Sequence, residues 1–208
     1  LPVTLGTQTA GSIIRPSSFC GVFGFKPTFG SIDRTGILKN NDLFDTVGII
    51  ASEIEFIQLV FKNILNESKN FPWIEKYESK YKRFKRKKKL KIGYFDQSLD
   101  IYKDIKPDVK KFYEEKLKKL KKEFSLKLVK GKLFNKFHRY HDILYNKSLS
   151  YYFKNYTKNK KIFSKTLLKM INKGEKINIK KYNNVLKKIN VLKKIISLET
   201  SKFDFIVA

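Results

Sequence analysis

Four residues near the start of the chain, 9–12, have the types and order expected of a hydrolytic site. They read Thr-Ala-Gly-Ser, and Arg15 follows the serine by three positions. Small residues ahead of a serine let successive backbone N–H groups turn toward one point, where they can stabilise an oxyanion. The Ser12 hydroxyl beside them would be the nucleophile of an acyl transfer. Serine at such a position also commonly caps a turn, so the tetrapeptide alone leaves both roles open.

The surrounding sequence carries a longer pattern. Residues 5–30 read LGTQTAGSIIRPSSFCGVFGFKPTFG and resemble the glycine- and serine-rich core of the amidase signature family. The resemblance continues in LFDTVG at 43–48 and, more weakly, at 90–93 and 203–207. It implies that Ser12 is the nucleophile of an amide hydrolase. It also implies an oxyanion hole formed by four backbone N–H groups, those of Thr9, Ala10, Gly11 and Ser12.

The resemblance also implies how this serine is activated. Amidase signature enzymes use a serine in a cis peptide and a lysine, and both precede the nucleophile loop. Only eleven residues precede Ser12, and neither group is among them. The chain begins at Leu1 and ends in an apolar run at Ala208, so we expect both ends to be cuts. An internal fragment of an amidase domain, inactive by itself, is the expectation.

Arg15 is the candidate for substrate binding. Many family members have an aspartate where this chain has Gln8, and their arginine lies two residues after the nucleophile rather than three. The version found here resembles the malonamidase-type branch, in which the arginine binds a substrate carboxylate. A carboxylate-bearing amide is therefore one expected substrate. The alternative is that Arg15 pairs with a structural acid or with loop carbonyls.

The charge of the chain is large and uneven. The net charge is +27, yet residues 1–61 hold four basic and five acidic residues, and the rest hold 42 and 14. A basic segment can bind nucleic acid or an anionic membrane. Here the lysines are spread over residues 62–208 without a recognised nucleic-acid module, so we interpret them as a drift in surface composition. No stretch approaches the roughly 18 to 20 apolar residues of a membrane span.

Few residues point to metals or cofactors. His138 and His141 are three apart, with Asp142 near them, and we interpret them as solvated rather than metal-bound. No phosphate-binding glycine loop occurs, and we expect no cofactor. The single cysteine, Cys20, lies in an apolar stretch and is predicted to be a small buried residue. Without an internal disulfide, a cytoplasmic location is the expectation, and a homodimer is left open.

Elements around the loop are predicted from spacing. Pro16 suits the first turn of a short helix that would use Ser17 and Ser18 for local hydrogen bonds, and residues 22–25 suit a short buried strand. A capping box at Ser52 and Glu55 precedes an apolar stripe that ends at residue 65. The later pattern predicts strands at 90–95, 126–129 and 203–207, a helix from Pro107 onward, and helices within 134–198 with a stripe of Val185, Ile189, Leu192, Ile195 and Ile196.

These elements indicate an α/β fold, and the resemblance implies a mixed central sheet covered by helices on both sides. We expect residues 1–208 to be part of one amidase domain. Its parts would be a nucleophile-loop core at 1–66, a basic linker or surface excursion at 67–89, and a lysine-rich α/β part at 90–208.

Three functions stay open from the sequence. The first is a stand-alone amidase that acts on a small-molecule amide. The second is the A subunit of a glutamine-dependent aminoacyl-tRNA amidotransferase, which belongs to the same family. The third is a basic nucleic-acid-binding protein that keeps the loop without using it, an interpretation that the scattered charge does not favour.

Overall fold

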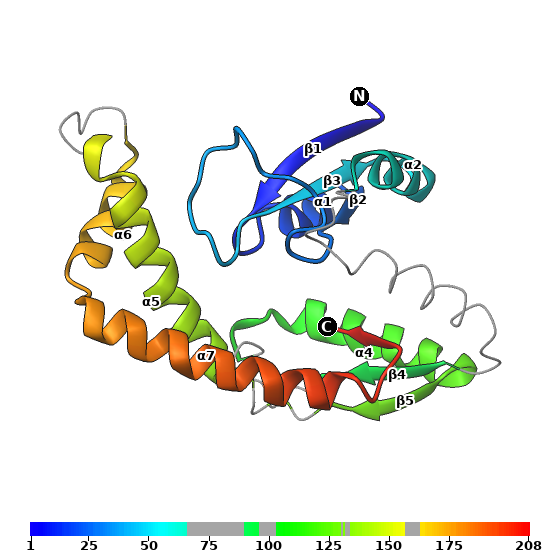
Figure 1. The fold of residues 1–208 in the computed structure, drawn as a ribbon. Coiled ribbons are helices and arrows are strands. Elements are labelled where there is room, and N and C mark those ends of the chain that lie inside the picture. The colour runs from blue at the N-terminus through cyan, green and yellow to red at the C-terminus, as the bar shows by residue number, and fades with distance from the viewer. Residues whose placement is uncertain (66–89, 96–102, 130, 132–133, 157–162) are drawn as a thin grey trace. The chain divides into compact units, whose positions relative to one another are not determined.

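The computed structural model (Figure 1) describes residues 1–65, 90–95, 103–129, 131, 134–156 and 163–208. They belong to two compact units, one drawn from 1–82 and 148–171, the other from 83–147 and 172–208. Strands and helices occur in both units, which confirms the α/β class. The predicted linker at 67–89 lies outside the described residues, so the division into three parts stays a prediction.

The first unit contains a three-stranded antiparallel sheet. Strand β3 (Thr46–Ala51) lies between β1 (Val3–Gln8) and β2 (Phe23–Phe25), as Figure 1 shows in blue and cyan. Five of the six β3 residues are buried, as suits a central strand. The sequence predicted β2 but neither β1 nor β3. For β1 the reason is that its residues are mostly small and polar and form no apolar run. The prediction that β2 is buried is wrong at Phe23, which is 49% exposed.

Helix α2 (Ile54–Ile64) covers this sheet through a compact apolar core. Ile57 packs with Ile49 and Ala51 of β3, and the Phe25 and Phe61 rings meet edge to face at 5.1 Å. The predicted capping box is not formed. The helix is preceded by Glu53 at the N-cap, without a side-chain cap, and the Ser52 hydroxyl donates instead to the Pro2 carbonyl at 3.4 Å.

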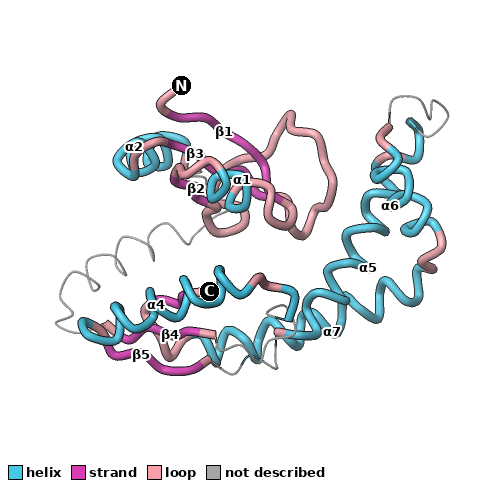
Figure 2. Tube along the Cα trace, turned by 180° about the vertical axis from the view of Figure 1, so that it is seen from behind, coloured by secondary structure: helices cyan, strands magenta, loops and turns pink. Residues whose placement is uncertain are grey.

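A long loop, residues 26–45, connects β2 to β3 and is drawn in pink in Figure 2. It turns at Gly30 and Gly36, whose φ angles of 83° and 79° suit glycine. The buried Asn41 side chain donates to the Ser148 hydroxyl at 2.9 Å, which ties the loop to helix α5 (Asn135–Tyr152). The C-terminal end of this loop, around Asn41, is therefore held by a hydrogen bond to α5.

The second unit contains a parallel sheet in the order β5-β4-β6. Its strands are β4 (Lys91–Tyr94), β5 (Ser125–Leu128) and β6 (Phe205–Val207), and α4 (Pro107–Glu123) connects β4 to β5. These elements confirm the predicted strand, helix and strand succession. The core beside β4 centres on Phe95 and Val129.

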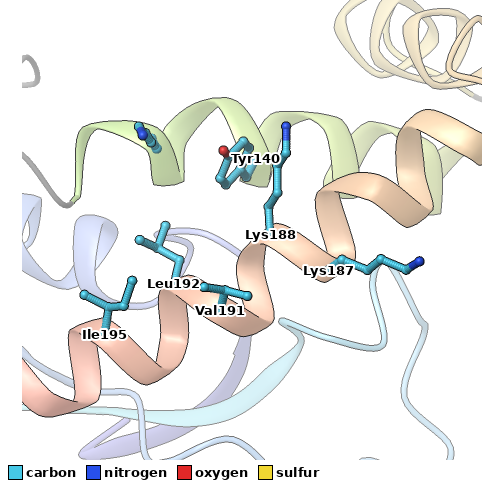
Figure 3. Close-up of a pocket in the computed structure, with 7 residues that line it drawn as sticks. Tyr140, Lys187, Lys188, Val191, Leu192 and Ile195 are labelled. Atoms are coloured by element: carbon cyan, nitrogen blue, oxygen red, sulfur yellow. The ribbon is translucent and has the colours of Figure 1, made fainter.

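The helical segments that the structure describes after β5 are α5, the 3₁₀ helix η3 (Lys154–Tyr156), α6 (Lys165–Glu175) and α7 (Ile179–Thr200). Of the predicted α7 stripe, Val185, Ile189 and Leu192 are buried, whereas Ile195 is 42% exposed. Ile195 lines a groove of about 480 Å³ between α5 and α7 (Figure 3). No helix among the described residues is long and apolar enough to span a membrane.

Candidate active site

The predicted oxyanion loop, residues 9–12, joins the end of β1 to the short helix α1 (Ile14–Phe19). The buried side chain of Gln8, the last residue of β1, reaches over the loop. Its Oε1 accepts the N–H groups of Ile13 at 2.8 Å and Ile14 at 3.0 Å. The first N–H groups of a helix have no partner within the helix, so Gln8 supplies one. One amide side chain thus fixes the entry into α1.

Ile13, directly after the candidate nucleophile, is the buried anchor of the loop. Its side chain is 0% exposed and lies against two glycines that face each other across β1 and β3, Gly6 and Gly48. The Ile13 carbonyl accepts the Ser17 hydroxyl at 2.7 Å. The anchor leaves the preceding residue, Ser12, at the surface, where it is exposed.

Three of the four predicted oxyanion donors have no hydrogen-bond acceptor among the described residues. The backbone N–H groups of Ala10, Gly11 and Ser12 donate to no acceptor within the part of the chain that the structure describes. The Gly11 carbonyl is used, since it accepts the Arg15 N–H at 3.0 Å. Free donors beside an exposed hydroxyl are what a tetrahedral intermediate needs. These three N–H groups are therefore available to a further acceptor.

The loop is also held at its first residue, an interaction that the sequence did not predict. The Thr9 hydroxyl donates to Oδ1 of Asp45 at 2.6 Å. Asp45 is only 5% exposed and lies immediately before β3. The sequence carried no signal for this pair, because β3 itself was not predicted and the burial of Asp45 is known only from the structure. A buried carboxylate needs partners, and the Thr9 hydroxyl is one of them.

Arg15 extends from α1 beside the loop. A Cβ built on Gly11 would lie 3.8 Å from the Cβ of Arg15. The side chain is exposed, and its guanidinium forms no hydrogen bond or ion pair with the described residues. Arg34 differs, because it pairs with Asp42 and Asp45, each at 3.3 Å. The alternative of a structural partner for Arg15 therefore finds no support among those residues.

The side chains that follow Arg15 on α1 either bond to the backbone or are exposed to solvent. Ser17 bonds to the backbone as predicted, whereas Ser18 is exposed. The prediction that Cys20 is buried is wrong: the thiol is free and exposed, because Cys20 lies at the C-terminal end of α1, which faces solvent there. The neighbouring Phe19 is 86% exposed.

Two hollows are lined by residues outside loop 9–12. One of about 500 Å³ is lined by residues of the segment 29–39, including Asp33, whose pKa is lowered by hydrogen bonds from the Thr35 hydroxyl and N–H. The other is the α5–α7 groove of Figure 3, whose lining includes Tyr140 and Lys188 together with the apolar Val191, Leu192 and Ile195. Neither combines an exposed serine with free backbone donors, so loop 9–12 is the better candidate site.

The described residues contain no cluster of histidine, cysteine or acidic side chains suited to a metal ion. His138 is exposed, and the His141 ring stacks on Tyr145 at 5.5 Å.

Comparison with known proteins extends the match beyond the loop. The family model for amidases matches residues 1–201. The A subunit of the glutamyl-tRNA(Gln) amidotransferase of Fusobacterium nucleatum is 34% identical over 128 residues, 58% of this chain and 25% of that protein. The first of the corresponding A subunits of Clostridium acetobutylicum is 44% identical over 63 residues, 30% of this chain and 13% of that protein.

Solved structures share the fold. One described as an amidase superposes with a TM-score of 0.78 at 18% identity, covering 98% of this chain and 44% of that chain. An allophanate hydrolase of Kluyveromyces lactis gives a TM-score of 0.76 at 16% identity, covering 99% of this chain and 34% of that one. The chain thus spans at most about a quarter of these curated relatives and under half of these structures. Because the family model covers nearly all of the sequence, the chain belongs to the amidase family.

Proposed function

We propose that this protein hydrolyses the carbon–nitrogen bond of a carboxamide through an acyl-enzyme on Ser12. The observation that carries the proposal is the loop itself: an exposed Ser12 preceded by free backbone N–H groups and clamped by Gln8 and Ile13. A serine that only capped a turn would donate to, or accept from, a nearby backbone group. The Ser12 side chain has no such partner among the described residues.

The proposed reaction has two halves. Ser12 Oγ attacks the carbonyl carbon, and the electron pair of the C=O bond moves to the oxygen. That oxyanion accepts hydrogen bonds from the N–H groups of Ala10, Gly11 and Ser12, with Thr9 as the fourth donor that the family resemblance implies. Collapse expels ammonia or an amine, and water then cleaves the ester to release the acid and free Ser12. The family resemblance assigns removal of the Ser12 proton to a cis-serine and lysine pair.

Arg15 sets the proposed substrate class. An unpaired, planar guanidinium one helical turn from the nucleophile can bind a carboxylate through two parallel hydrogen bonds. The proposed substrate is therefore a small amide that carries a carboxylate a few bonds from the scissile carbonyl, as the resemblance to the malonamidase-type branch suggests.

The test compares two serines in the full-length protein. Ser12→Ala is expected to abolish ammonia release from small amides, because it removes the hydroxyl that forms the proposed acyl-enzyme. Ser18→Ala, an exposed serine on α1, is the matched control and should leave the rate unchanged. Mass spectrometry of the protein with a slow ester substrate should locate the acyl group on Ser12. Full activity in Ser12→Ala would overturn the assignment.

A second candidate function is supported by the relatives named above, both of which are amidotransferase A subunits. In that case the same serine chemistry would act on glutamine, and the ammonia would pass to a partner protein. Gln8 and the position of Arg15 favour the first candidate. Purification under native conditions distinguishes them: a stand-alone amidase isolates alone or as a homodimer, whereas an A subunit isolates with other subunits and prefers glutamine.

A further inference from the structure

We propose that Asp45 is the positioning residue of the oxyanion loop, acting through the Thr9 hydroxyl. The inference deepens the proposed function and rests on it. Its first observation is the 2.6 Å hydrogen bond from Thr9 Oγ1 to Asp45 Oδ1, which joins residues 36 positions apart. Thr9 is the first residue of the loop, so this bond fixes the loop where it leaves β1.

The second observation is that Asp45 is itself immobilised. Its Oδ2 accepts the N–H groups of Asn40 and Asn41, both at 2.8 Å, and lies 3.3 Å from the Arg34 guanidinium. Its side chain is 6% exposed. A carboxylate that is buried, paired and fully hydrogen-bonded cannot change rotamer without leaving several partners unsatisfied. Thr9 is thus bound to a rigid acceptor.

The third observation is the support behind Asp45. The Asn41 amide donates to Ser148 of α5 at 2.9 Å, and the Tyr152 hydroxyl donates to Asp42. The loop segment that holds Asp45 is therefore tied to the part of α5 that belongs to the same unit. A chain of hydrogen bonds runs from α5 through Asn41 and Asp45 to Thr9.

These contacts clamp the oxyanion loop at both ends. Asp45 holds its start through Thr9, and Gln8 holds its end through Ile13 and Ile14. The free N–H groups of Ala10, Gly11 and Ser12 lie between the two clamps. Fixed donors stabilise an oxyanion because they need no reorganisation when charge develops, and this benefit appears in the transition state rather than in substrate binding.

The experiment uses the full-length protein with any partner proteins that isolate with it. Thr9→Val removes the hydroxyl at nearly constant volume, Thr9→Ser keeps it, and Asp45→Asn removes the charge. Thr46→Val is the matched control, because Thr46 is buried and also donates one side-chain hydrogen bond, to the Phe44 carbonyl at 3.0 Å. The readouts are kcat, KM and the affinity of a boronic acid that mimics the tetrahedral adduct on Ser12.

Thr9→Val and Asp45→Asn should lower kcat about 10- to 100-fold, as misplaced catalytic groups do. The boronate affinity should fall in parallel, with KM changed less than about threefold, since ground-state binding is kept. Thr9→Ser should restore kcat. Thr46→Val should change the melting temperature without lowering kcat.

The outcomes separate the two proposals. If Ser12→Ala is inactive but Thr9→Val keeps its kcat and boronate affinity, the positioning role of Asp45 is wrong and the amidase proposal stands. If Thr9→Val and Thr46→Val lose activity equally, the effect is one of general stability, which also overturns the role. Should Asp45→Asn fail to fold, the Thr9→Val and Thr9→Ser pair still decides. Full turnover by Ser12→Ala removes both proposals.

Discussion

Ile13 occupies the space that the missing side chain of Gly48 leaves open. A Cβ built on Gly48 would lie 2.4 Å from Ile13 Cδ1 and 2.5 Å from the Phe25 carbonyl oxygen. The residue after the candidate nucleophile is therefore seated directly on the central strand. The position of Ser12 depends on a glycine 36 residues away, and this dependence can be measured.

Gly48→Ala is expected to destabilise the protein by about 1–3 kcal/mol, the usual effect of an extra methyl group in a filled core. Gly6→Ala is the matched control, because Gly6 pairs with Gly48 across the sheet and its Cβ would meet Ile13 only at 3.8 Å. Thermal or urea unfolding measures both variants. Equal stability of the two would contradict the close fit.

Replacing Gln8 tests the clamp at the end of the loop. Gln8→Leu leaves two backbone donors without their acceptor and should cost about 1–3 kcal/mol of the free energy of unfolding, together with activity. Gln8→Glu keeps an acceptor oxygen and should lose less. Gln58→Leu, on the exposed face of α2, is the control for the change of side chain and should have little effect on activity. An unchanged kcat in Gln8→Leu would argue against the clamp.

Arg15→Met is expected to raise KM for a carboxylate-bearing amide about 10- to 100-fold, because a charge-assisted hydrogen bond to the substrate is lost. A neutral amide of similar size is the control substrate, and its KM should change little. Arg15→Lys should restore part of the selectivity, since lysine keeps the charge without the planar fork. Equal losses on both substrates would assign Arg15 a structural role.

The Asp42 and Tyr152 pair predicts a pH-dependent stability. The hydrogen bond from the Tyr152 hydroxyl lowers the pKa of Asp42, so its contribution is present above the unfolded pKa of about 4 and is lost as pH falls through the folded value. Burial, followed by the hydrogen bond to Asp42, raises the pKa of Tyr152 to about 12. That contribution is complete below about pH 10 and is lost as pH rises through about 12.

The destabilisation caused by Tyr152→Phe should therefore be largest near neutral pH and shrink as the solution is made strongly acidic. Urea unfolding at a series of pH values measures it. Tyr151→Phe is the control. Tyr151 is the neighbouring tyrosine and is 74% exposed, whereas the hydroxyl that donates to Asp42 belongs to Tyr152. A pH-independent difference between Tyr152→Phe and the unchanged protein would exclude the linkage.

The local pattern of the sequence was enough for several elements and for the candidate nucleophile. Spacing predicted β2, α2, β4, α4, β5 and the late helices, and the LGTQTAGSIIRPSSF stretch indicated Ser12 and its backbone donors. These features depend on residues close together in the chain, where turn propensity and apolar period act directly. Strand β1 has no such apolar period in its sequence. It is a strand because it pairs with β3, and that partner lies about 40 residues away in the chain.

The supports of the site could be decided only by tertiary structure. Nothing in the sequence joins Thr9 to Asp45, Ile13 to Gly48, or Asn41 to Ser148, because each partner is brought close by strand pairing or helix packing across many residues. The exposure of Cys20 and Ile195 was likewise missed, since an apolar neighbourhood in sequence does not determine which face is covered. The amino-acid sequence by itself thus determined the candidate loop and the family. The folded chain decided what holds that loop in place, because buried hydrogen bonds and close packing exist only between surfaces that folding brings together.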